Sequence, residues 1–209
     1  MNADMSEPSP KRETSDDRRA AIALATRDLI VEKGFEGLRT RDIAERVGIN
    51  IATLHYHVPS KAALIELVTQ SMREEFIAQY LSHACSAKTP LLRLRQELAD
   101  FADTLIGNPK LFLVMSELVE KARRDPGLMA AISPMQNKWR QMLTDILHDG
   151  RADGTFRADL DPEAAALTIM GALSMHARLE GGDPISFARL AVELERAFIH
   201  PHHCNETDL

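Results

Sequence analysis

Side chains able to bind an anion or transfer a proton are concentrated in one short stretch of this 209-residue chain. His55, Tyr56 and His57 are consecutive there, and Arg41 and Lys61 add positive charge on either side. Imidazole can act as a general base near neutral pH, and all these groups can donate hydrogen bonds to an anion. The stretch therefore offers two kinds of chemistry, acid–base catalysis and anion binding.

Catalysis is the less favoured of the two. His55 and His57 are two residues apart, so on a helix they point to different sides. No nucleophile, acid and base stand together in a recognisable arrangement. We expect a protein that is not an enzyme. A helical enzyme with a histidine general base is the alternative, and turnover of a substrate would reveal it.

The elements that position these side chains are two short helices. Thr40 is placed to cap a helix whose inner face carries Ile43, Ala44 and Val47. Gly48 follows where that helix must end, since glycine tolerates the positive φ of a tight turn.

A second helix is expected over residues 51–57, with Asn50 as its cap and Leu54 as its main inward anchor. Its other side chains are left for the surface. Two helices hinged at a glycine, the second of them polar and exposed, are typical of a helix-turn-helix that reads DNA.

Longer helices flank this unit. Residues 18–33 place Ile22, Ala25, Leu29 and Ile30 on one face. Ser60 can cap a helix from residue 61 to about residue 84, and its apolar stripe is Leu64, Leu67, Val68, Met72 and Phe76. With Phe35 and Leu38, these helices predict one small shared core.

Residues 18–68 resemble the DNA-binding domain of the TetR family of bacterial transcriptional regulators. The residues that carry the resemblance are Ala25, Leu29, Gly34, Thr40, Ile43, Ala44, Val47, Gly48, Thr53, Leu54, Pro59, Ser60, Lys61 and Leu64. The resemblance implies an all-α protein, with a three-helix helix-turn-helix DNA-binding domain and a helical ligand-binding and dimerisation domain. It also implies a repressor that binds a palindromic operator as a homodimer and is released by a small effector.

The boundaries expected on this basis are a disordered polar tail over residues 1–16, a DNA-binding domain over residues 17–62, a C-terminal domain over residues 63–200 and a tail over residues 201–209. The expected DNA-binding residues are Thr40, Arg41, Asn50, Ile51, Ala52, Thr53, His55, Tyr56, His57 and Lys61. Among them, Thr53 and Tyr56 are candidates for base edges, and Thr40 and Lys61 for phosphates.

Two positions depart from the family pattern within this domain. His55 stands where relatives usually carry an aromatic residue, most often tyrosine, and Val58 where they usually carry phenylalanine. The change at His55 puts one phosphate contact in question. A dimeric helical adaptor that binds small molecules but has weakened DNA binding is therefore the second interpretation. Salt-independent failure to bind any DNA would support it.

Charge is divided unevenly along the chain. Residues 11–61 hold 10 Lys and Arg against 8 Asp and Glu, whereas the whole chain has a net charge of −6 and the remainder therefore −8. One basic end on an acidic body fits a protein that meets DNA at one end. Since so small a positive excess binds phosphates weakly, two copies acting together are expected.

Composition indicates the cellular compartment and the cofactors to expect. Two cysteines, Cys85 and Cys204, are too few for a disulfide scaffold, and no apolar run is long enough for a signal or a membrane span. We expect a cytoplasmic protein that does not enter a membrane and needs no cofactor. His200, His202, His203 and Cys204 are of the types that bind zinc or copper, but they lack a second spaced ligand pair, so no metal site is expected.

The second half of the chain has the pattern of further helices. A break at residues 107–109 precedes an expected helix over residues 110–124, and a break at residues 125–127 ends it. The next helix is expected over about residues 134–149. Residues 150–162 read as a loop pinned to the core by Phe156 and Leu160. Two last helices, residues 162–179 and 184–200, are expected to pair with a second subunit as in relatives. The expected interface residues are Leu167, Gly171, Ser174, Leu190, Leu194 and Phe198.

An effector would bind where relatives turn their middle helices toward a central cavity. The candidate residues are Phe101, Leu105, Phe112, Met115, Leu118, Val119, Trp139, Met142, Met170 and His176. An apolar stripe at helical spacing is also what an ordinary core requires. His176 could donate to a polar group of an effector or be a satisfied core histidine. Methionine adapts to varied apolar guests, so the expected effector is hydrophobic or aromatic.

Overall fold

The computed structural model describes residues 14–83 and 89–199, which form nine α-helices and one short 3₁₀ turn. The helices are α1 (Ser15–Lys33), α2 (Thr40–Val47), α3 (Ile51–His57), α4 (Lys61–His83), α5 (Pro90–Gly107), α6 (Pro109–Ala122), α7 (Pro126–Ala152), α8 (Pro162–Leu179) and α9 (Pro184–Phe198), and the turn η1 is Phe35–Gly37. No strand occurs in this described part, which confirms the expected all-α class.

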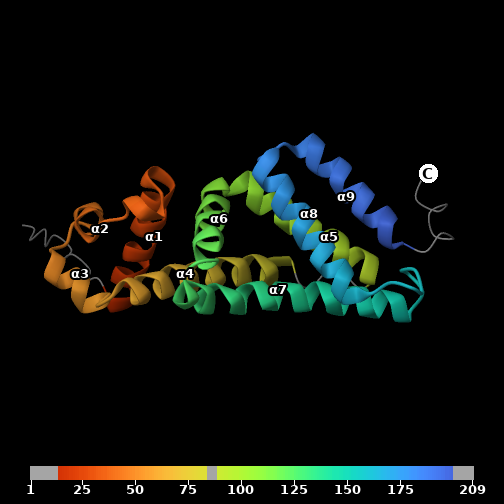
Figure 1. Ribbon diagram of the computed structural model, residues 1–209, viewed down its shortest axis with the longest axis horizontal. Helices are drawn as coiled ribbons and strands as arrows, with labels where there is room; N and C mark the ends of the chain where they lie inside the picture. Colours follow the sequence, from red (N-terminus) through yellow and green to blue (C-terminus); the bar gives the residue numbers. More distant parts are fainter. Residues whose placement is uncertain (1–13, 84–88, 200–209) are drawn as a thin grey trace, which may run out of the picture.

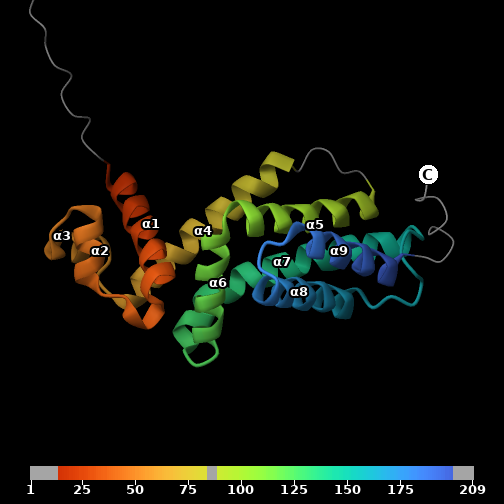
Figure 2. The same ribbon diagram turned by 90° about the horizontal axis from the view of Figure 1, so that it is seen from above.

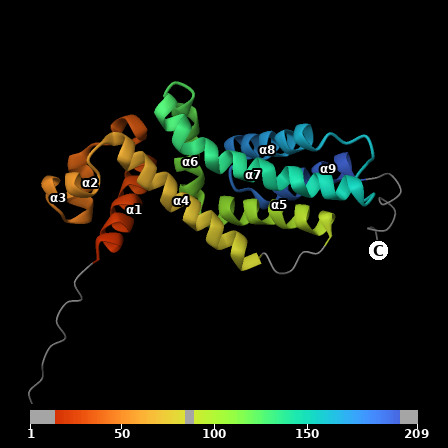
Figure 3. The ribbon, with the colours of Figure 1, turned by 90° about the horizontal axis from the view of Figure 1, so that it is seen from below.

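The molecule is elongated, with α1 to α3 at one end and α5, α8 and α9 at the other (Figure 1). Helix α4 leaves the first end and runs into the body, and α6 stands across the long axis beside α1 (Figure 2). Seen from below, α7 runs the length of the body (Figure 3), where it packs against α4, α5, α6 and α8. Thus α4, α6 and α7 connect the two ends.

The first of three apolar cores lies inside the helix-turn-helix end. Its buried residues come from α1, α2, α3 and the start of α4, and they are Ile22, Ala23, Leu29, Ile43, Ala44, Leu54, Val58, Leu64 and Leu67. Val58 fills the position where relatives usually carry phenylalanine and is buried there. Because Leu64 and Leu67 belong to this core, one face of the first turns of α4 packs with the helix-turn-helix end.

A second core joins the two ends. It combines Ile30 of α1 and Phe35 of η1 with buried residues of α4, α6 and α7, namely Ile65, Val68, Met72, Leu111, Val114, Leu118, Ala122, Leu128 and Ile132. Tight packing transmits displacement between the elements that share a core. A shift of α6 would therefore reach α1.

The third core lies in the body, between α5, α7, α8 and α9. The loop after α7 closes it, because Phe156 and Leu160 are almost completely buried, as expected. Phe156 packs against Gly150, where a Cβ atom would overlap its ring. Its amide donates to the Gly150 carbonyl at 2.8 Å, and the Arg157 amide donates to the Phe198 carbonyl at 2.9 Å. The loop thereby ties the end of α9 to the end of α7.

Two expected helix starts near the N-terminus were wrong. Helix α1 begins at Ser15 rather than Arg18, because Thr14 and Asp17 form a reciprocal capping box that orders the first turn. Residues 14–16 therefore do not belong to a disordered tail. Thr40 is the first residue of α2 and not its cap, since extended Arg39 occupies the cap position without a side-chain cap bond.

The expected bounds of α7 were also wrong. The helix begins at Pro126 and not near Pro134, because the Asp125 carboxylate accepts from the amides of Gly127 and Leu128 and Pro126 suits the first helical position. Leu128 and Ile132 are buried against α4 and α6, and this packing holds Pro134 inside the helix. The helix then continues through Gly150 to Ala152, so the following loop is shorter than expected.

Within residues 14–83 and 89–199, no helix is both long and apolar enough to cross a lipid bilayer. The same residues contain no group of three or more histidine, cysteine, aspartate or glutamate side chains arranged to hold a metal ion. The described residues do not include Cys85 or the candidate metal ligands of the C-terminal tail, His200, His202, His203 and Cys204.

Candidate DNA-binding surface and effector site

The turn between α2 and α3 has the geometry that its sequence predicts. Gly48 adopts a left-handed conformation, with φ 74° and ψ 32°. The Ile49 amide donates to the Ala44 carbonyl at 2.9 Å, which closes the end of α2. The Asn50 side chain then accepts from the Thr53 amide at 2.7 Å and begins α3. These bonds set the angle between the two helices.

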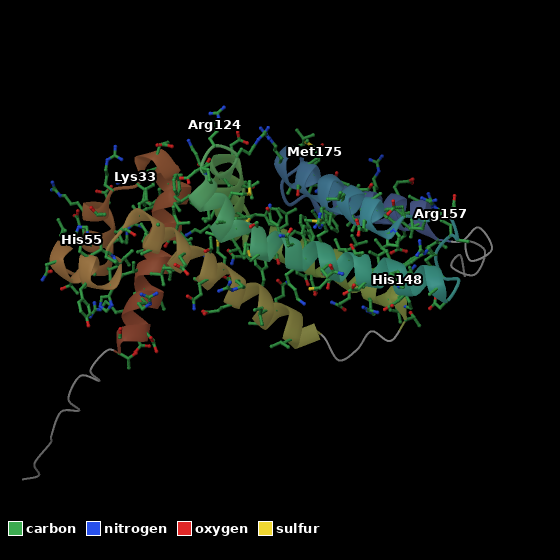
Figure 4. The ribbon with its side chains drawn as sticks, turned by 60° about the horizontal axis from the view of Figure 1, so that its bottom comes forward. Lys33, His55, Arg124, His148, Arg157 and Met175 are labelled. Atoms are coloured by element: carbon green, nitrogen blue, oxygen red, sulfur yellow. The ribbon has the colours of Figure 1, made fainter. Side chains whose placement is uncertain are left out.

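Helix α3 is anchored through one side chain and exposes most of the rest. Leu54 is 2% exposed, whereas Tyr56 is 83% and Ile51 46% exposed. Figure 4 shows His55 on the outer surface of this end of the molecule. The ten predicted DNA-binding residues divide into two sets: Thr40, Arg41, Asn50, Ile51, Ala52, His55, Tyr56 and Lys61 are exposed, and Thr53 and His57 are half-buried.

An arginine from α1 fixes the far end of α3. The Arg19 guanidinium donates to the His57 carbonyl at 3.1 Å, and this carbonyl belongs to the last turn of the helix. Positive charge at a helix C-terminus stabilises the helix dipole. Arg19 therefore orients α3, a role that the sequence pattern did not indicate.

Two ion pairs join α1 to α2. Lys33 pairs with Asp42 at 2.5 Å, and Arg46 pairs with Glu32 through two hydrogen bonds of 3.0 and 2.8 Å. These cations hold the pKa of the Asp42 and Glu32 carboxyl groups below their ordinary values. The pairs link α2 to α1 and contribute little net charge for DNA.

Two cations near the helix-turn-helix make neither a hydrogen bond nor an ion pair with the described residues. They are Arg41 in the first turn of α2 and Lys61 at the start of α4. Lys61 Nζ lies 4.6 Å from the centre of the Phe35 ring, so an aromatic face orients this ammonium group while it stays exposed. Arg41 and Lys61 are thus available to an external anion.

A polar chain connects the DNA-binding end to the body. Arg27 of α1, which is 9% exposed, donates to Glu75 of α4 at 2.8 Å. The other oxygen of Glu75 accepts from the Asn108 side-chain amide at 2.5 Å, and Asn108 also caps α6. One carboxylate thus joins α1 to the corner between α5 and α6.

Helix α6 makes further contacts with the DNA-binding end. Lys110 pairs with Asp28 of α1 at 2.8 Å, and Lys121 pairs with Glu36 of η1 at 2.8 Å. These pairs lie on opposite sides of the apolar contact made by Val114 and Leu118. Helix α6 therefore forms the main joint between the two ends.

The structure divides the predicted effector residues between two cores. Leu118 is buried in the core that reaches α1, and Met115 and Val119 pack against it. Phe101, Trp139 and Met170 pack against the body core instead. Leu105 is buried, and Phe112 and Met142 are half-buried. The ten residues thus do not line one common space.

Four aromatic rings meet in the body. Phe101 of α5 stacks with Trp139 of α7 at 5.8 Å between ring centres and with Phe187 of α9 at 6.0 Å. Phe112 of α6 meets Phe101 edge to face at 4.8 Å. The centre-to-centre distances lie within the usual range of about 4.5–7 Å for aromatic pairs. Phe101, Phe112 and Trp139 are thus predicted effector residues that the structure brings together, and Phe187 is a fourth ring that was not predicted.

His176 of α8 lies at the edge of this cluster. It is 8% exposed, and its ring meets Phe187 edge to face at 5.4 Å. Its Nε2 is 3.1 Å from the Ser186 hydroxyl, whereas its Nδ1 is buried without a hydrogen-bond partner among the described residues. Only one of the two ring nitrogens of His176 therefore has a hydrogen-bond partner there.

Glu97 of α5 was missed in the sequence analysis. It lies one helical turn before Phe101 and is half-buried, and the nearby Trp139 side chain lowers its pKa slightly by stabilising the charged form. Burial, with a smaller contribution from nearby Asp100, raises the pKa of Glu97 to about 7. An acidic residue within the stripe of Leu94, Leu98 and Phe101 was the signal that could have drawn attention to it.

A separate cavity of about 230 Å³ lies where α4 meets the corner of α5 and α6. It is lined by Glu75, Gln79, Asp103, Thr104, Gly107, Asn108 and Leu111. Its polar groups bond mostly to one another, as when the Thr104 hydroxyl donates to Gln79 at 2.7 Å. None of the predicted effector residues lines it.

Comparison with known proteins agrees with this architecture. Residues 22–68 match the family model described as bacterial regulatory proteins of the tetR family. Residues 91–194 match the model described as the tetracyclin repressor-like C-terminal domain. The two matches cover most of the chain.

The chain belongs to the TetR family.

Individual TetR-family relatives are distant in sequence. The chain is 27% identical over 145 residues to the HTH-type transcriptional repressor KstR2 of Mycolicibacterium smegmatis, a match that covers 69% of this chain and 70% of the relative. A TetR transcription regulator from Haloarcula marismortui superposes with a TM-score of 0.76 at 22% identity, covering 88% of this chain and all of the other. AibR in complex with isovaleryl coenzyme A and operator DNA superposes with a TM-score of 0.71 at 21% identity, covering 87% and 98%. The latter two share the TetR fold with this chain.

The last two helices of this TetR-family chain carry an exposed apolar face. Leu167, Gly171, Ser174 and Met175 of α8 are exposed, and Figure 4 shows Met175 projecting away from the body. The large exposed apolar residues of these two helices are Leu167, Met175, Leu179, Ile185 and Val192. Of the other expected interface residues, Leu190 is half-buried, and Leu194 and Phe198 are buried in the subunit's own core.

Proposed function

We propose that this protein is a transcriptional repressor that binds a palindromic operator as a homodimer and is released by a small effector, in the cytoplasm where the DNA lies. The observation that carries the proposal is α3. A seven-residue helix with one buried side chain contributes little to a core, yet Asn50 and Arg19 hold it at both ends. Such a helix is suited to the major groove.

The contacts follow from exposure and charge. Thr53 and Tyr56 read base edges, and the Ile51 side chain meets a thymine methyl group. Arg41 and Lys61 bind phosphates, and the Thr40 hydroxyl and the imidazoles of His55 and His57 add hydrogen bonds. Asn50 and Ala52 lie on the same exposed surface, where Asn50 is also occupied as the helix cap.

A homodimer follows from the apolar face on α8 and α9. Exposed leucine, isoleucine and methionine side chains around the small residues Gly171 and Ser174 suit close packing against a second copy. Two recognition helices could then enter successive major grooves, about 34 Å apart. We retain Leu167, Gly171, Ser174 and Leu190 in this interface and omit Leu194 and Phe198, which the subunit buries itself.

Effector release is supported by the joint at α6. A ligand that moved α6 would displace α1 through the shared core, the Lys110 and Lys121 ion pairs and the chain through Glu75. The required energy is modest, since a difference of about 3 kcal/mol between two conformations changes DNA affinity roughly a hundredfold. Among relatives, the repressor name of KstR2 and the complex of AibR with operator DNA and isovaleryl coenzyme A support the same scheme.

The first experiment is selection of bound duplexes from a random DNA pool at two salt concentrations. Enrichment of a palindrome with half-sites about one helical turn apart is the expected result. Enrichment should weaken at the higher salt because phosphate neutralisation releases counterions. Absence of any enriched sequence at either salt would contradict the proposed repressor.

Two substitutions separate positioning contacts from sequence reading. Lys61→Ala should weaken binding to all sequences and reduce the salt slope by about one. Tyr56→Ala should change the preference among sequences with little change in the salt slope. Equal preference and affinity for wild type and Tyr56→Ala would remove Tyr56 from the reading surface.

Dimerisation has a separate test by sedimentation. Leu167→Glu should produce monomers and weaken operator binding, because a charge would be buried at the centre of the interface. Leu113→Glu on α6 is the control, since Leu113 is exposed to a similar degree, at 53% against 54%. A dimer that survives Leu167→Glu would place the interface elsewhere.

The adaptor interpretation is favoured by one observation, the imidazole of His55 at a position where relatives carry an aromatic side chain. If the selection fails, His55→Tyr should restore measurable DNA binding. Continued absence of binding in that variant, with effector binding intact, would support the adaptor.

A further inference from the structure

The aromatic cluster and Glu97 form one continuous group. The Trp139 side chain stabilises the charged form of the nearby Glu97, Trp139 stacks on Phe101, and Phe101 contacts Phe187 and Phe112. The residues come from α5, α6, α7 and α9, which lie around the interior of the body (Figures 1 and 2). Only Phe187 of these four rings is classed as buried, so the cluster is not sealed from solvent.

Glu97 makes no ion pair within the described chain. The neighbouring arginines of α5 point to other partners, since Arg93 pairs with Asp149 at 2.7 Å and Arg95 pairs with Glu195 at 2.8 Å. A half-buried carboxylate without a cation is costly to keep charged. The raised pKa of Glu97 expresses that cost. A bound cation would remove it.

Aromatic faces supply the second half of a cation site. A cation near the face of tryptophan or phenylalanine is attracted by the negative face of the ring, and tryptophan is the strongest of these partners. Phe101 lies one helical turn from Glu97 on α5, and Trp139 of α7 stacks on Phe101, so a cation that enters between the two rings would meet both faces. The unpartnered Nδ1 of His176, beside Phe187, adds one polar atom for a ligand hydrogen bond.

We infer that the effector is an organic cation, whose ammonium group is bound by Glu97 and the faces of Trp139 and Phe101 and whose apolar part packs against Phe112 and Phe187. This inference rests on the proposed effector-responsive function and names the class of ligand at the site in the body. Organic anions are disfavoured, because Glu97 would repel them and the chain outside residues 11–61 carries a net charge of −8.

The position of Phe112 connects this site to DNA binding. Its ring meets Phe101 in the cluster, while its neighbour Leu111 is buried in the core that reaches α1. A ligand that enters between the rings displaces Phe112 and therefore α6. Helix α6 carries the ion pairs of Lys110 and Lys121 with Asp28 and Glu36 at the DNA-binding end.

Fluorescence of Trp139 reports binding at this site directly, because it is the single tryptophan of the chain. Two probes of equal shape isolate the charge: phenyltrimethylammonium and its uncharged counterpart tert-butylbenzene. Titration of the full-length protein at pH 8 should give at least tenfold tighter binding of the ammonium compound. Equal affinity for both probes, tighter binding of the neutral probe, or binding of neither would overturn the inference.

Two variants of α5 test the role of Glu97. Glu97→Gln should reduce the affinity ratio of the two probes to about two or less. Asp103→Asn removes the same charge from an exposed position of the same helix and should leave the ratio unchanged. An equal fall in both variants, or no fall in Glu97→Gln, would contradict direct recognition by Glu97. Thermal unfolding of both variants confirms that they are folded.

DNA selection with the same protein keeps the two hypotheses separate. Operator binding without preference for the ammonium probe would retain the repressor and reject the cationic effector. Preference for the ammonium probe without binding to any DNA would retain the cation site and reject the repressor.

Discussion

The two ends of the molecule use their functional side chains in opposite ways. At the DNA-binding end, the candidate residues stand outside a small core and only Leu54 of α3 enters it. In the body, the candidate residues are part of the packing, as in the stack of Trp139, Phe101 and Phe187. A surface site can therefore lose a residue without losing its fold, whereas the effector site and the fold of the body depend on the same contacts.

Electrostatics differ in the same way. Four carboxyl groups at the DNA-binding end, those of Asp17, Glu32, Glu36 and Asp42, have lowered pKa values because hydrogen bonds to side chains stabilise their charged forms. Glu97 in the body has a raised pKa because burial destabilises its charge. The ionised carboxylates of the first group hold elements together at neutral pH, whereas ionisation of Glu97 weakens the fold there.

The largest expected effect is on packing in the body. Gly150→Ala should destabilise the protein by about 3 kcal/mol, because the new Cβ overlaps the Phe156 ring and lies 3.0 Å from Pro90 Cβ. Urea unfolding measures this change. Gly107→Ala, at the end of α5 with open space around its Cβ, is the control and should change stability by less than about 1 kcal/mol. Similar stability of the two variants would show that the loop adjusts freely.

A second prediction concerns pH. The pKa of Glu97 rises from 4.5 to about 7 on folding, so the folded state binds a proton more tightly than the unfolded state. Stability should therefore be greatest below about pH 4.5 with respect to this group and should fall as pH rises to about 7. Glu97→Gln lacks this loss and should be more stable than wild type at pH 8 by up to about 3 kcal/mol.

Thermal unfolding of wild type and Glu97→Gln at pH 5 and pH 8 measures the difference. The nearby charges of Asp100 and Arg93 also act on Glu97, the first raising and the second lowering its pKa. Asp103→Asn serves as the control for general charge effects. A gain in stability of Glu97→Gln that is equal at both pH values would refute the assigned cause.

The contact between the two ends gives a third, smaller effect. A double-mutant cycle of Arg27→Met and Glu75→Gln should show a coupling of about 1 to 2 kcal/mol in unfolding, since Arg27 is buried and Glu75 also binds Asn108. The exposed pair of Arg196 and Glu193 is the control, with less than about 0.5 kcal/mol expected. Equal coupling energies for the two pairs would show that the Arg27–Glu75 pair stabilises the fold no more than an exposed ion pair does.

The smallest expected effect distinguishes helix caps at the two ends. Asn50→Ala and Thr89→Ala each remove a cap and should each cost about 1 kcal/mol of stability. Asn50→Ala should also weaken DNA binding severalfold, because it loosens α3, while Thr89→Ala at the start of α5 should not. Gel-shift titration with the selected operator measures both, and equal affinities would show that the cap of α3 has no part in binding.

Much of the fold could be predicted from local signals. The turn at Gly48, the cap at Asn50 and the helix starts at Lys61, Pro90, Pro162 and Pro184 depend on residues within one turn of each other. The start of α7 could not be predicted in the same way. Asp125 with Pro126 and, further on, Pro134 both carry the signal of a helix start. Burial of Leu128 and Ile132 against α4 and α6 selects the earlier start. Leu194 and Phe198 likewise follow an amphipathic pattern that does not say which apolar surface they meet.

The sequence by itself determined the helix-turn-helix end, the family and the division of charge, because these depend on residue types at short, regular spacings. Tertiary structure alone decided which apolar side chains form the core, which stay exposed on α8 and α9, and which gather near Glu97. It also joined Arg27, Glu75 and Asn108, from three distant segments, through hydrogen bonds to the Glu75 carboxylate. Helical periodicity specifies the face of a helix that is buried, but the partner of that face depends on how all the helices pack together.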